Sequence, residues 1–185
     1  MNSAAIAPEL QELIDRQKIH DCIVRYCSGV DRFDRDMVRG VYHSDAMDDH
    51  GAFVGPVEAF IDWAFAYHAK YQHTHKHYVL NHRCELDGDT AHTETYWLFS
   101  GKNQIGPGLT LSGGRYIDRF EKRDGRWAIA ARKCVIEWNG ALGEFPMPQE
   151  ALDAYAATGV ASRDKNDPSY ERPLCVTRSS TVLPF

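Results

Sequence analysis

The sequence has no run of apolar residues that approaches the roughly 18 needed to span a membrane. It also has no block of lysine and arginine, and its net charge of −5 comes from scattered residues of both signs. We therefore expect neither nucleic acid nor an anionic membrane surface as a partner. The N-terminus lacks the basic and apolar regions of a secretory signal, which predicts a cytoplasmic protein.

Cysteine is scarce and follows no recognisable pattern. The five cysteines are an odd number without the spacing of a metal-binding motif, so we expect buried thiols in a reducing cytoplasm. Hydrophobic residues make up 43% and charged residues 25% of the 185 residues. This composition is typical of a globular protein and provides enough apolar material for one domain with a sizeable core.

The first part of the chain has the spacing of helices. Apolar residues recur every three or four positions over residues 8–31, and residues 34–38 indicate a short second helix with an aspartate cap. Residues 46–54 contain a short strand or hairpin arm. Residues 57–69 form a third expected helix, which is apolar over much of its surface.

The second part of the chain alternates as strands do. Asp-Gly turns at residues 87–89 and 124–125 separate strands expected at residues 75–86, 90–102, 109–123 and 126–139. Helices followed by a strand meander predict an α+β fold, with N-terminal helices packed on a curved antiparallel sheet around a conical cavity. We assign residues 1–139 to this domain. The proline-broken arm of residues 140–185 is expected to pack over its own pocket or on a neighbouring subunit.

Two distant positions carry the candidate chemistry. Asp31 stands near the end of the first helix, and His77 begins the first long strand on the same face as His75. A histidine held by a carboxylate is a proton-transfer couple. Tyr26 reaches the same cavity only if the helix ends or loosens near Gly29. Taken alone, the aspartate is also typical of a helix end and the tyrosine of a core aromatic.

Histidines at alternate positions of residues 73–77 raise the alternative of a metal site. Same-face neighbours on a strand lie about 7 Å apart, so three in a row do not easily reach one ion. Two of them with a distant ligand could, and the possible partners are Asp48, Asp49 and His50. We treat this site as the minor alternative and predict no bound metal.

Three further residues are candidates for substrate contact. Arg132 lies on a mostly apolar face of the last strand, where an arginine needs a carboxylate, a substrate oxygen or a leaving group. Trp63 and Tyr96 belong to a set of aromatic residues that suits a hydrophobic ligand. The same residue types also fill any packed core.

Five segments in order make residues 10–139 similar to a known family: Tyr26-Cys-Ser-Gly-Val-Asp31, His77-Tyr-Val-Leu-Asn81, Gly113-Gly-Arg-Tyr116, Arg123-Asp-Gly-Arg-Trp127 and Arg132. The chain resembles the SnoaL-like branch of the NTF2-like superfamily. Within it, the resemblance is to a group that includes bile acid 7α-dehydratase, γ-hexachlorocyclohexane dehydrochlorinase and, more distantly, scytalone dehydratase. His73, His75 and the C-terminal arm depart from the family pattern.

The resemblance implies a cone-shaped barrel with a catalytic pair at Asp31 and His77 and a pocket arginine at Arg132. Tyr26 matches the tyrosine of the dehydratase, where the dehydrochlorinase has lysine, so the chain leans toward the dehydratase pattern. No metal or organic cofactor is implied, and the usual assembly is a trimer, with dimers elsewhere in the superfamily. We therefore expect a cofactor-independent lyase that acts on a small hydrophobic cyclic substrate.

The same fold is also compatible with other activities. One is isomerisation or cyclisation of a ketosteroid or polyketide, which also needs a base and an enolate stabiliser. The other is a non-catalytic role as a small-molecule carrier or as a subunit like that of ring-hydroxylating dioxygenases. For the lyase, the expected catalytic residues are Tyr26, Asp31 and His77, and the expected substrate contacts are Arg132, Trp63 and Tyr96.

Overall fold

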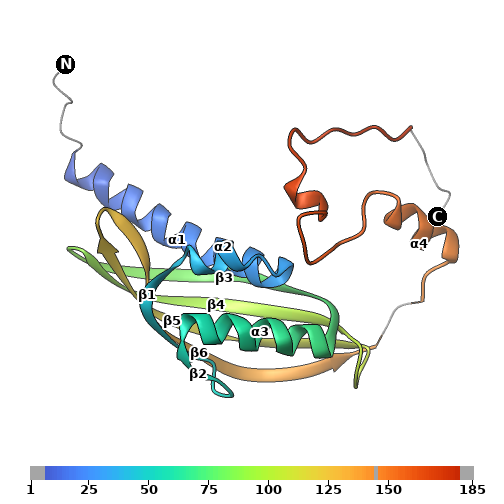
Figure 1. The fold of residues 1–185 in the computed structure, drawn as a ribbon, viewed down its shortest axis with the longest axis horizontal. Helices are drawn as coiled ribbons and strands as arrows, with labels where there is room; N and C mark the ends of the chain where they lie inside the picture. Colours follow the sequence, from blue (N-terminus) through green and yellow to red (C-terminus); the bar gives the residue numbers. More distant parts are fainter. Residues whose placement is uncertain (1–6, 144–145, 180–185) are drawn as a thin grey trace.

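The computed structural model describes residues 7–143 and 146–179. Figure 1 shows N-terminal helices lying along a curved sheet, with a C-terminal arm at one end, and this confirms the predicted α+β class. The helices of the domain are α1 (Pro8–Arg32), α2 (Arg35–Arg39) and α3 (Val57–Tyr71). The strands are β1 (Tyr42–Asp49), β2 (Val54–Pro56), β3 (Gln72–Asp87), β4 (Thr90–Asn103), β5 (Leu109–Arg123) and β6 (Arg126–Leu142). None of the helices in the described part of the chain is long and apolar enough to cross a membrane.

The sheet is mixed, with strand order β2-β1-β6-β5-β4-β3. Strands β3 to β6 form the expected antiparallel meander, and β2 pairs antiparallel with β1. The structure differs from a purely antiparallel sheet at one pairing, because β1 runs parallel to β6. This pairing joins the hairpin arm to the last strand, so local sequence patterns do not reveal it.

The end of α1 differs from the sequence-based expectation. The helix is continuous through Gly29 and ends at Arg32, followed by Phe33 with a left-handed φ of 55°, so the loosening near Gly29 that was set as a condition for Tyr26 to reach the cavity does not occur. A Cβ on Gly29 would lie 2.7 Å from a side-chain carbon of Val38. The glycine therefore allows α2 to pack closely against α1. Asp34 caps α2 as predicted, since its carboxylate accepts a hydrogen bond from the backbone N–H of Met37 at 3.1 Å.

A register shift on β3 changes which side chains face α1. The predicted alternation holds as far as Val79, but the pairing with β4 shifts between Val79 and His82. After the shift His82, and not Asn81, faces the helix, and its ring contacts that of His20 at 5.4 Å between centroids. The extra residue of a β-bulge explains why simple alternation fails there.

The cysteines are free thiols in the described residues. Cys22 and Cys27 are buried and Cys84 and Cys134 are partly buried, as expected, whereas Cys175 in the arm is exposed.

The C-terminal arm returns to the end of α1. It contains α4 (Gln149–Ala156) and the 3₁₀ turn η1 (Pro168–Tyr170), and it begins after β6, which extends beyond the predicted boundary at residue 139. The Tyr170 hydroxyl donates to Oδ2 of Asp34 at 2.7 Å, and Arg32 forms an ion pair with Asp167 at 3.0 Å. These contacts hold the arm against its own domain.

Gly114 lies at a register shift between β5 and β6, where the two strands approach closely. A Cβ there would lie 1.9 Å from the backbone oxygen of Val135. We expect Gly114→Ala to lower the free energy of unfolding by about 2–3 kcal/mol, measured by denaturant titration, because the strand cannot move aside without losing its pairing. Gly140→Ala on β6 is the control, since a Cβ at Gly140 meets nothing within 4 Å. Equal effects of the two substitutions would contradict this explanation.

Candidate active site

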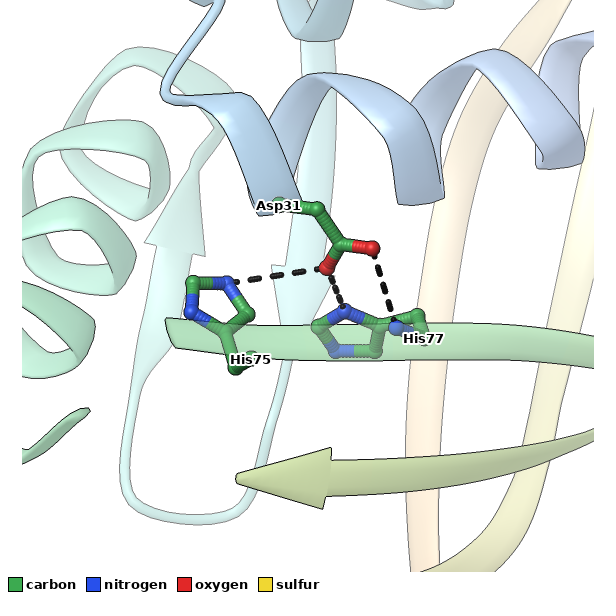
Figure 2. Close-up of side chains that lie close together, drawn as sticks. All are labelled: Asp31, His75 and His77. Carbon is green, nitrogen blue, oxygen red and sulfur yellow. Dashed lines mark hydrogen bonds and ion pairs between the residues drawn. The ribbon is translucent and has the colours of Figure 1, made fainter. Parts of the chain in front are cut away.

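Asp31 and His77 are in direct contact, as Figure 2 shows. Nδ1 of His77 lies 2.7 Å from Oδ1 of Asp31, and the backbone N–H of His77 donates to Oδ2 at 3.0 Å. The pair forms because the last turn of α1 packs on the first part of β3. A carboxylate only accepts, so Nδ1 of the imidazole carries a hydrogen and Nε2 keeps its lone pair when the ring is neutral. In Figure 2 this second nitrogen faces away from Asp31.

His77 lines a cavity of about 210 Å³ between the helices and the concave face of the sheet. The cavity is mostly aromatic, and its lining includes Tyr26, Phe60, Trp63, Tyr67, Trp97 and Phe99. Charge that develops on a group in such an apolar space interacts strongly with nearby donors and charges. A histidine with a free lone pair at the wall of this cavity is therefore placed to act as a base.

His75 also lies beside the carboxylate of Asp31. Its Nε2 lies 3.6 Å from Oδ1 of Asp31, and its Nδ1 accepts a hydrogen bond of 3.0 Å from Arg163 in the arm. A guanidinium only donates, so Nδ1 is unprotonated and the neutral ring carries its hydrogen on Nε2, facing the carboxylate. Burial holds the pKa of His75 well below its usual value, which keeps the ring neutral. The arm therefore sets the tautomer of a residue beside the Asp31–His77 pair.

Asp31, His75 and His77 also form a cluster that could hold a metal ion. Their ligand atoms all lie within 4.8 Å of one another. Ligation through Nε2 of His75 requires a lone pair there and therefore a hydrogen on Nδ1, the atom that faces the Arg163 donor. This contact opposes metal binding by the cluster. The distant ligands considered from the sequence, Asp48, Asp49 and His50, are not members of the cluster.

Tyr26 lines the cavity, while Arg132 does not. Burial raises the pKa of Tyr26 well above its usual value, so its hydroxyl stays protonated and is able to donate. The Arg132 guanidinium is buried and makes two hydrogen bonds of 2.7 Å to Asp118. Its central carbon lies 4.1 Å from the centre of the Tyr26 ring. Arg132 is therefore placed to act on a ligand through the electrostatics of this ring and not by direct contact.

Of the two aromatic residues expected to contact the substrate, Trp63 lines the cavity and Tyr96 does not. Trp63 on α3 lines the cavity, as expected for a substrate contact. Tyr96 is 41% exposed on the outer face of β4, whereas its neighbour Trp97 points inward and lines the cavity. Tyr96 is therefore wrong as a cavity residue. The side chains of β4 that point inward are those at odd positions from Ala91 to Trp97, so the cavity residue is its neighbour.

His50 lines the same cavity and was considered from the sequence only as a metal ligand. It follows β1, where its Nδ1 forms a hydrogen bond with Oδ1 of Asp48 and its Nε2 lies 3.3 Å from the Tyr26 hydroxyl. The sequence signal was an aspartate and a histidine two residues apart, which alternation places on one face of an extended chain. The structure therefore contains a second aspartate–histidine contact at the cavity.

His68 on α3 is another histidine of the cavity wall that the sequence analysis did not select. Its ring stacks on that of His75 with centroids 4.0 Å apart, and Nδ1 donates to Oε1 of Gln72 at 3.0 Å. Burial lowers its pKa from 6.5 to about 3, and the nearby His77 adds to the shift. The helical spacing Phe60, Ala64, His68 was the signal that could have identified it as inward-facing.

Comparisons with known proteins agree with this fold. Residues 11–133 match the family model described as a SnoaL-like domain. The solved structure of LinA has a TM-score of 0.70 and 23% identity, covering 76% of this chain and 99% of that chain. The hexachlorocyclohexane dehydrochlorinase LinA-type3 from Novosphingobium barchaimii has a TM-score of 0.67 and 21% identity, covering 76% and 99%.

A third solved structure, a candidate scytalone dehydratase from Novosphingobium aromaticivorans, has a TM-score of 0.64 and 14% identity. It covers 72% of this chain and 91% of that chain. At these identities the solved structures establish a shared fold, and they confirm the predicted NTF2-like architecture. No curated protein sequence matches the chain.

The buried His68 predicts acid sensitivity. Its pKa is about 3 in the folded protein, against 6.5 in an unfolded chain, so the unfolded state binds more protons between these values. Stability therefore falls as pH drops through this range, by about 2 kcal/mol from this residue at pH 5. We expect His68→Gln to reduce the loss of unfolding free energy between pH 7 and about pH 5 by this amount. His92→Gln, on the exposed face of β4, is the control. An equally steep loss in H68Q and wild type would contradict the assignment.

The contact from Arg163 predicts the tautomer of His75. Long-range proton–nitrogen NMR spectra of the wild type should show His75 with a bare Nδ1 and a protonated Nε2, because the guanidinium occupies Nδ1. Arg163→Gln should shift the His75 nitrogen resonances, since an amide side chain is shorter and carries no charge. Arg172→Gln, elsewhere in the arm, provides the control. Unchanged His75 resonances in R163Q would show that the arm does not set this tautomer.

Proposed function

Because the chain belongs to the SnoaL-like domain family, we propose that it is a cofactor-independent lyase that eliminates water or halide from a small hydrophobic cyclic molecule. The observation that carries this proposal is the 2.7 Å hydrogen bond between Asp31 and Nδ1 of His77, at the wall of an aromatic cavity. It gives the imidazole a fixed tautomer whose free nitrogen is available to a ligand.

In the proposed reaction, Nε2 of His77 removes a proton from a carbon next to an activating group. Asp31 stabilises the imidazolium that forms, as the aspartate does in a hydrolase triad. A positioned base of this kind contributes about 10²–10⁴-fold to the rate. The protonated hydroxyl of Tyr26 donates to the carbonyl or departing group, and the positive charge of Arg132 beside its ring stabilises the charge that develops there.

The residues that line the cavity support the proposal of a hydrophobic substrate. Aromatic side chains from α1, α3 and β4 form most of it, and these bind flat apolar molecules through contact area and ring stacking. The base and the Tyr26 donor are polar groups of this wall that would orient the ligand among them.

The same pair of groups supports a second candidate reaction, the isomerisation or cyclisation of a ketone. A base beside a hydroxyl donor is what enolate formation needs. The two reactions differ in their products, because elimination releases water or halide whereas isomerisation leaves the mass unchanged. A buried aspartate–histidine contact at the cavity favours either reaction over a simple carrier role.

We also propose that the chain forms a homo-oligomer, either a trimer or a dimer. The outer face of β3 and β4 carries large exposed apolar side chains: Tyr78, Leu80 and Tyr96. Association through this face of the sheet would remove them from water.

The proposal predicts how the two members of the pair combine. His77→Gln and Asp31→Asn should each lower elimination by about 10²–10⁴-fold, because either change removes the oriented base. The double variant should lose little more than either single variant, since the pair acts as one unit. The measurement is mass-spectrometric detection of water or halide loss from a panel of β-substituted cyclic and aromatic ketones.

The control for this series is His73→Gln, which changes an exposed histidine on the same strand. Circular dichroism of each variant checks that the fold is intact. Additive losses in the double variant, or turnover retained in H77Q, would contradict a coupled pair.

A further inference from the structure

We propose that Asp48, His50 and Tyr26 form an acid relay that protonates a departing hydroxyl group, so that the substrate is a β-hydroxy carbonyl compound and the reaction a dehydration. This inference rests on the proposed elimination and deepens it. It adds a second catalytic histidine, His50, and selects between the two leaving groups.

The relay is a continuous chain of hydrogen bonds that ends in the cavity. Oδ2 of Asp48 accepts from the Tyr42 hydroxyl at 2.7 Å, and Oδ1 accepts from Nδ1 of His50. Nε2 of His50 lies 3.3 Å from the hydroxyl of Tyr26. His50 and Tyr26 both line the cavity that His77 lines.

The buried carboxylate of Asp48 is in direct contact with the imidazole of His50. Asp48 is 1% exposed, and among the described residues it forms an ion pair with His50. The neighbouring cation Arg132 is already matched by Asp118 through two hydrogen bonds. A buried carboxylate needs a compensating charge, and an imidazolium in direct contact provides it. In that state Nε2–H of His50 donates to the oxygen of Tyr26, which frees the tyrosine hydrogen to donate into the cavity.

The base and the acid approach the ligand from different parts of the fold. His77 belongs to β3, at one edge of the sheet, whereas His50 follows β1, which lies next to the other edge. The sheet between these edges is curved (Figure 1), and both histidines line one cavity. The ring of His50 is held in place by stacking on Phe60, with centroids 4.6 Å apart.

These groups account for each proton and electron pair that moves in the elimination. Nε2 of His77 takes the proton from the carbon next to the carbonyl, and the electron pair of that C–H bond forms the carbon–carbon double bond. The C–O bond breaks, and the leaving oxygen takes a proton from Tyr26 to depart as water. Nε2–H of His50 returns a proton to Tyr26. The cycle ends with His77 protonated and His50 neutral, and exchange with water after product release restores both.

The proposed acid relay indicates that the leaving group is a hydroxyl group. Hydroxide is a poor leaving group and needs a proton as the C–O bond breaks, whereas chloride leaves as a stable anion. A relay that supplies a proton therefore helps the loss of water far more than the loss of chloride. Its presence at the cavity that His77 also lines assigns the site to a hydroxyl substrate.

The experiment compares two leaving groups on one carbon skeleton. The probes are the aldol adduct of benzaldehyde and acetone and the β-chloro ketone of the same skeleton, each corrected for its uncatalysed rate. His50→Phe keeps a flat ring against Phe60 but removes the proton donor. We expect H50F and Asp48→Asn to lower kcat for the hydroxy ketone by about 10²-fold or more. The loss for the hydroxy ketone should exceed the loss for the chloro ketone by at least about 30-fold.

A second variant of His50 separates the relay from a packing role. His50→Gln should be as impaired as H50F, although it loses the ring. Equal losses for the two probes in H50F, or turnover of the hydroxy ketone retained in H50Q, would overturn the relay.

The outcome for His77 tests the proposed function separately. H77Q should lose turnover of both probes, because both reactions need the base. Retained turnover in H77Q would overturn the proposed lyase mechanism even if H50F were impaired. A wild-type protein that eliminates neither probe would overturn the proposed function and the relay with it.

Discussion

Asp31 accepts hydrogen bonds from both the imidazole and the backbone N–H of His77, and these two bonds tie the end of α1 to the first part of β3. The Asp31 carboxylate therefore has both a structural and a chemical role. It fixes the approach of helix and strand, and it fixes which nitrogen of the histidine carries the hydrogen. The orientation of the proposed base depends on this contact.

The polar groups around the cavity are arranged as separate pairs in an apolar surrounding. Asp31 is matched by His77 on one side, and Asp48 by His50 on the other, while Arg132 is matched by Asp118 beneath the Tyr26 ring. Each buried charge has a partner, which limits the desolvation cost of placing it there. The arrangement leaves Nε2 of His77 and the hydroxyl of Tyr26 to meet a ligand, and these are the groups that the proposed proton transfer needs.

The sequence predicted the fold class and the central pair because each has a local or a motif-based signal. Helical periodicity and two Asp-Gly turns set the order of elements, and the ordered segments around Asp31 and His77 predicted their contact. Features that depend on distant contacts were not predicted. The parallel pairing of β1 with β6, the bulge that brings His82 inward and the contact of Arg163 with His75 have no periodic signature.

The expectation for Arg132 shows a different limit of sequence patterns. Its strand position predicted a buried arginine in need of a partner, which the structure confirms, but alternation cannot tell whether that partner is a ligand or another side chain. Asp118, on the neighbouring strand, is the residue opposite it in the β5–β6 register. His50 was likewise visible as half of an Asp-x-His pair, yet only the curved sheet places it at the same cavity as His77.

The central claim is that Asp31 holds His77 with Nδ1 protonated and Nε2 free toward the cavity. A neutron crystal structure of the deuterium-exchanged protein near neutral pH tests this directly, because it locates the hydrogen isotopes on each ring nitrogen. We expect deuterium on Nδ1 of His77, along the hydrogen bond to Asp31, and none on Nε2. Deuterium on Nε2 with a bare Nδ1, or a carboxylate turned away from the imidazole, would contradict it.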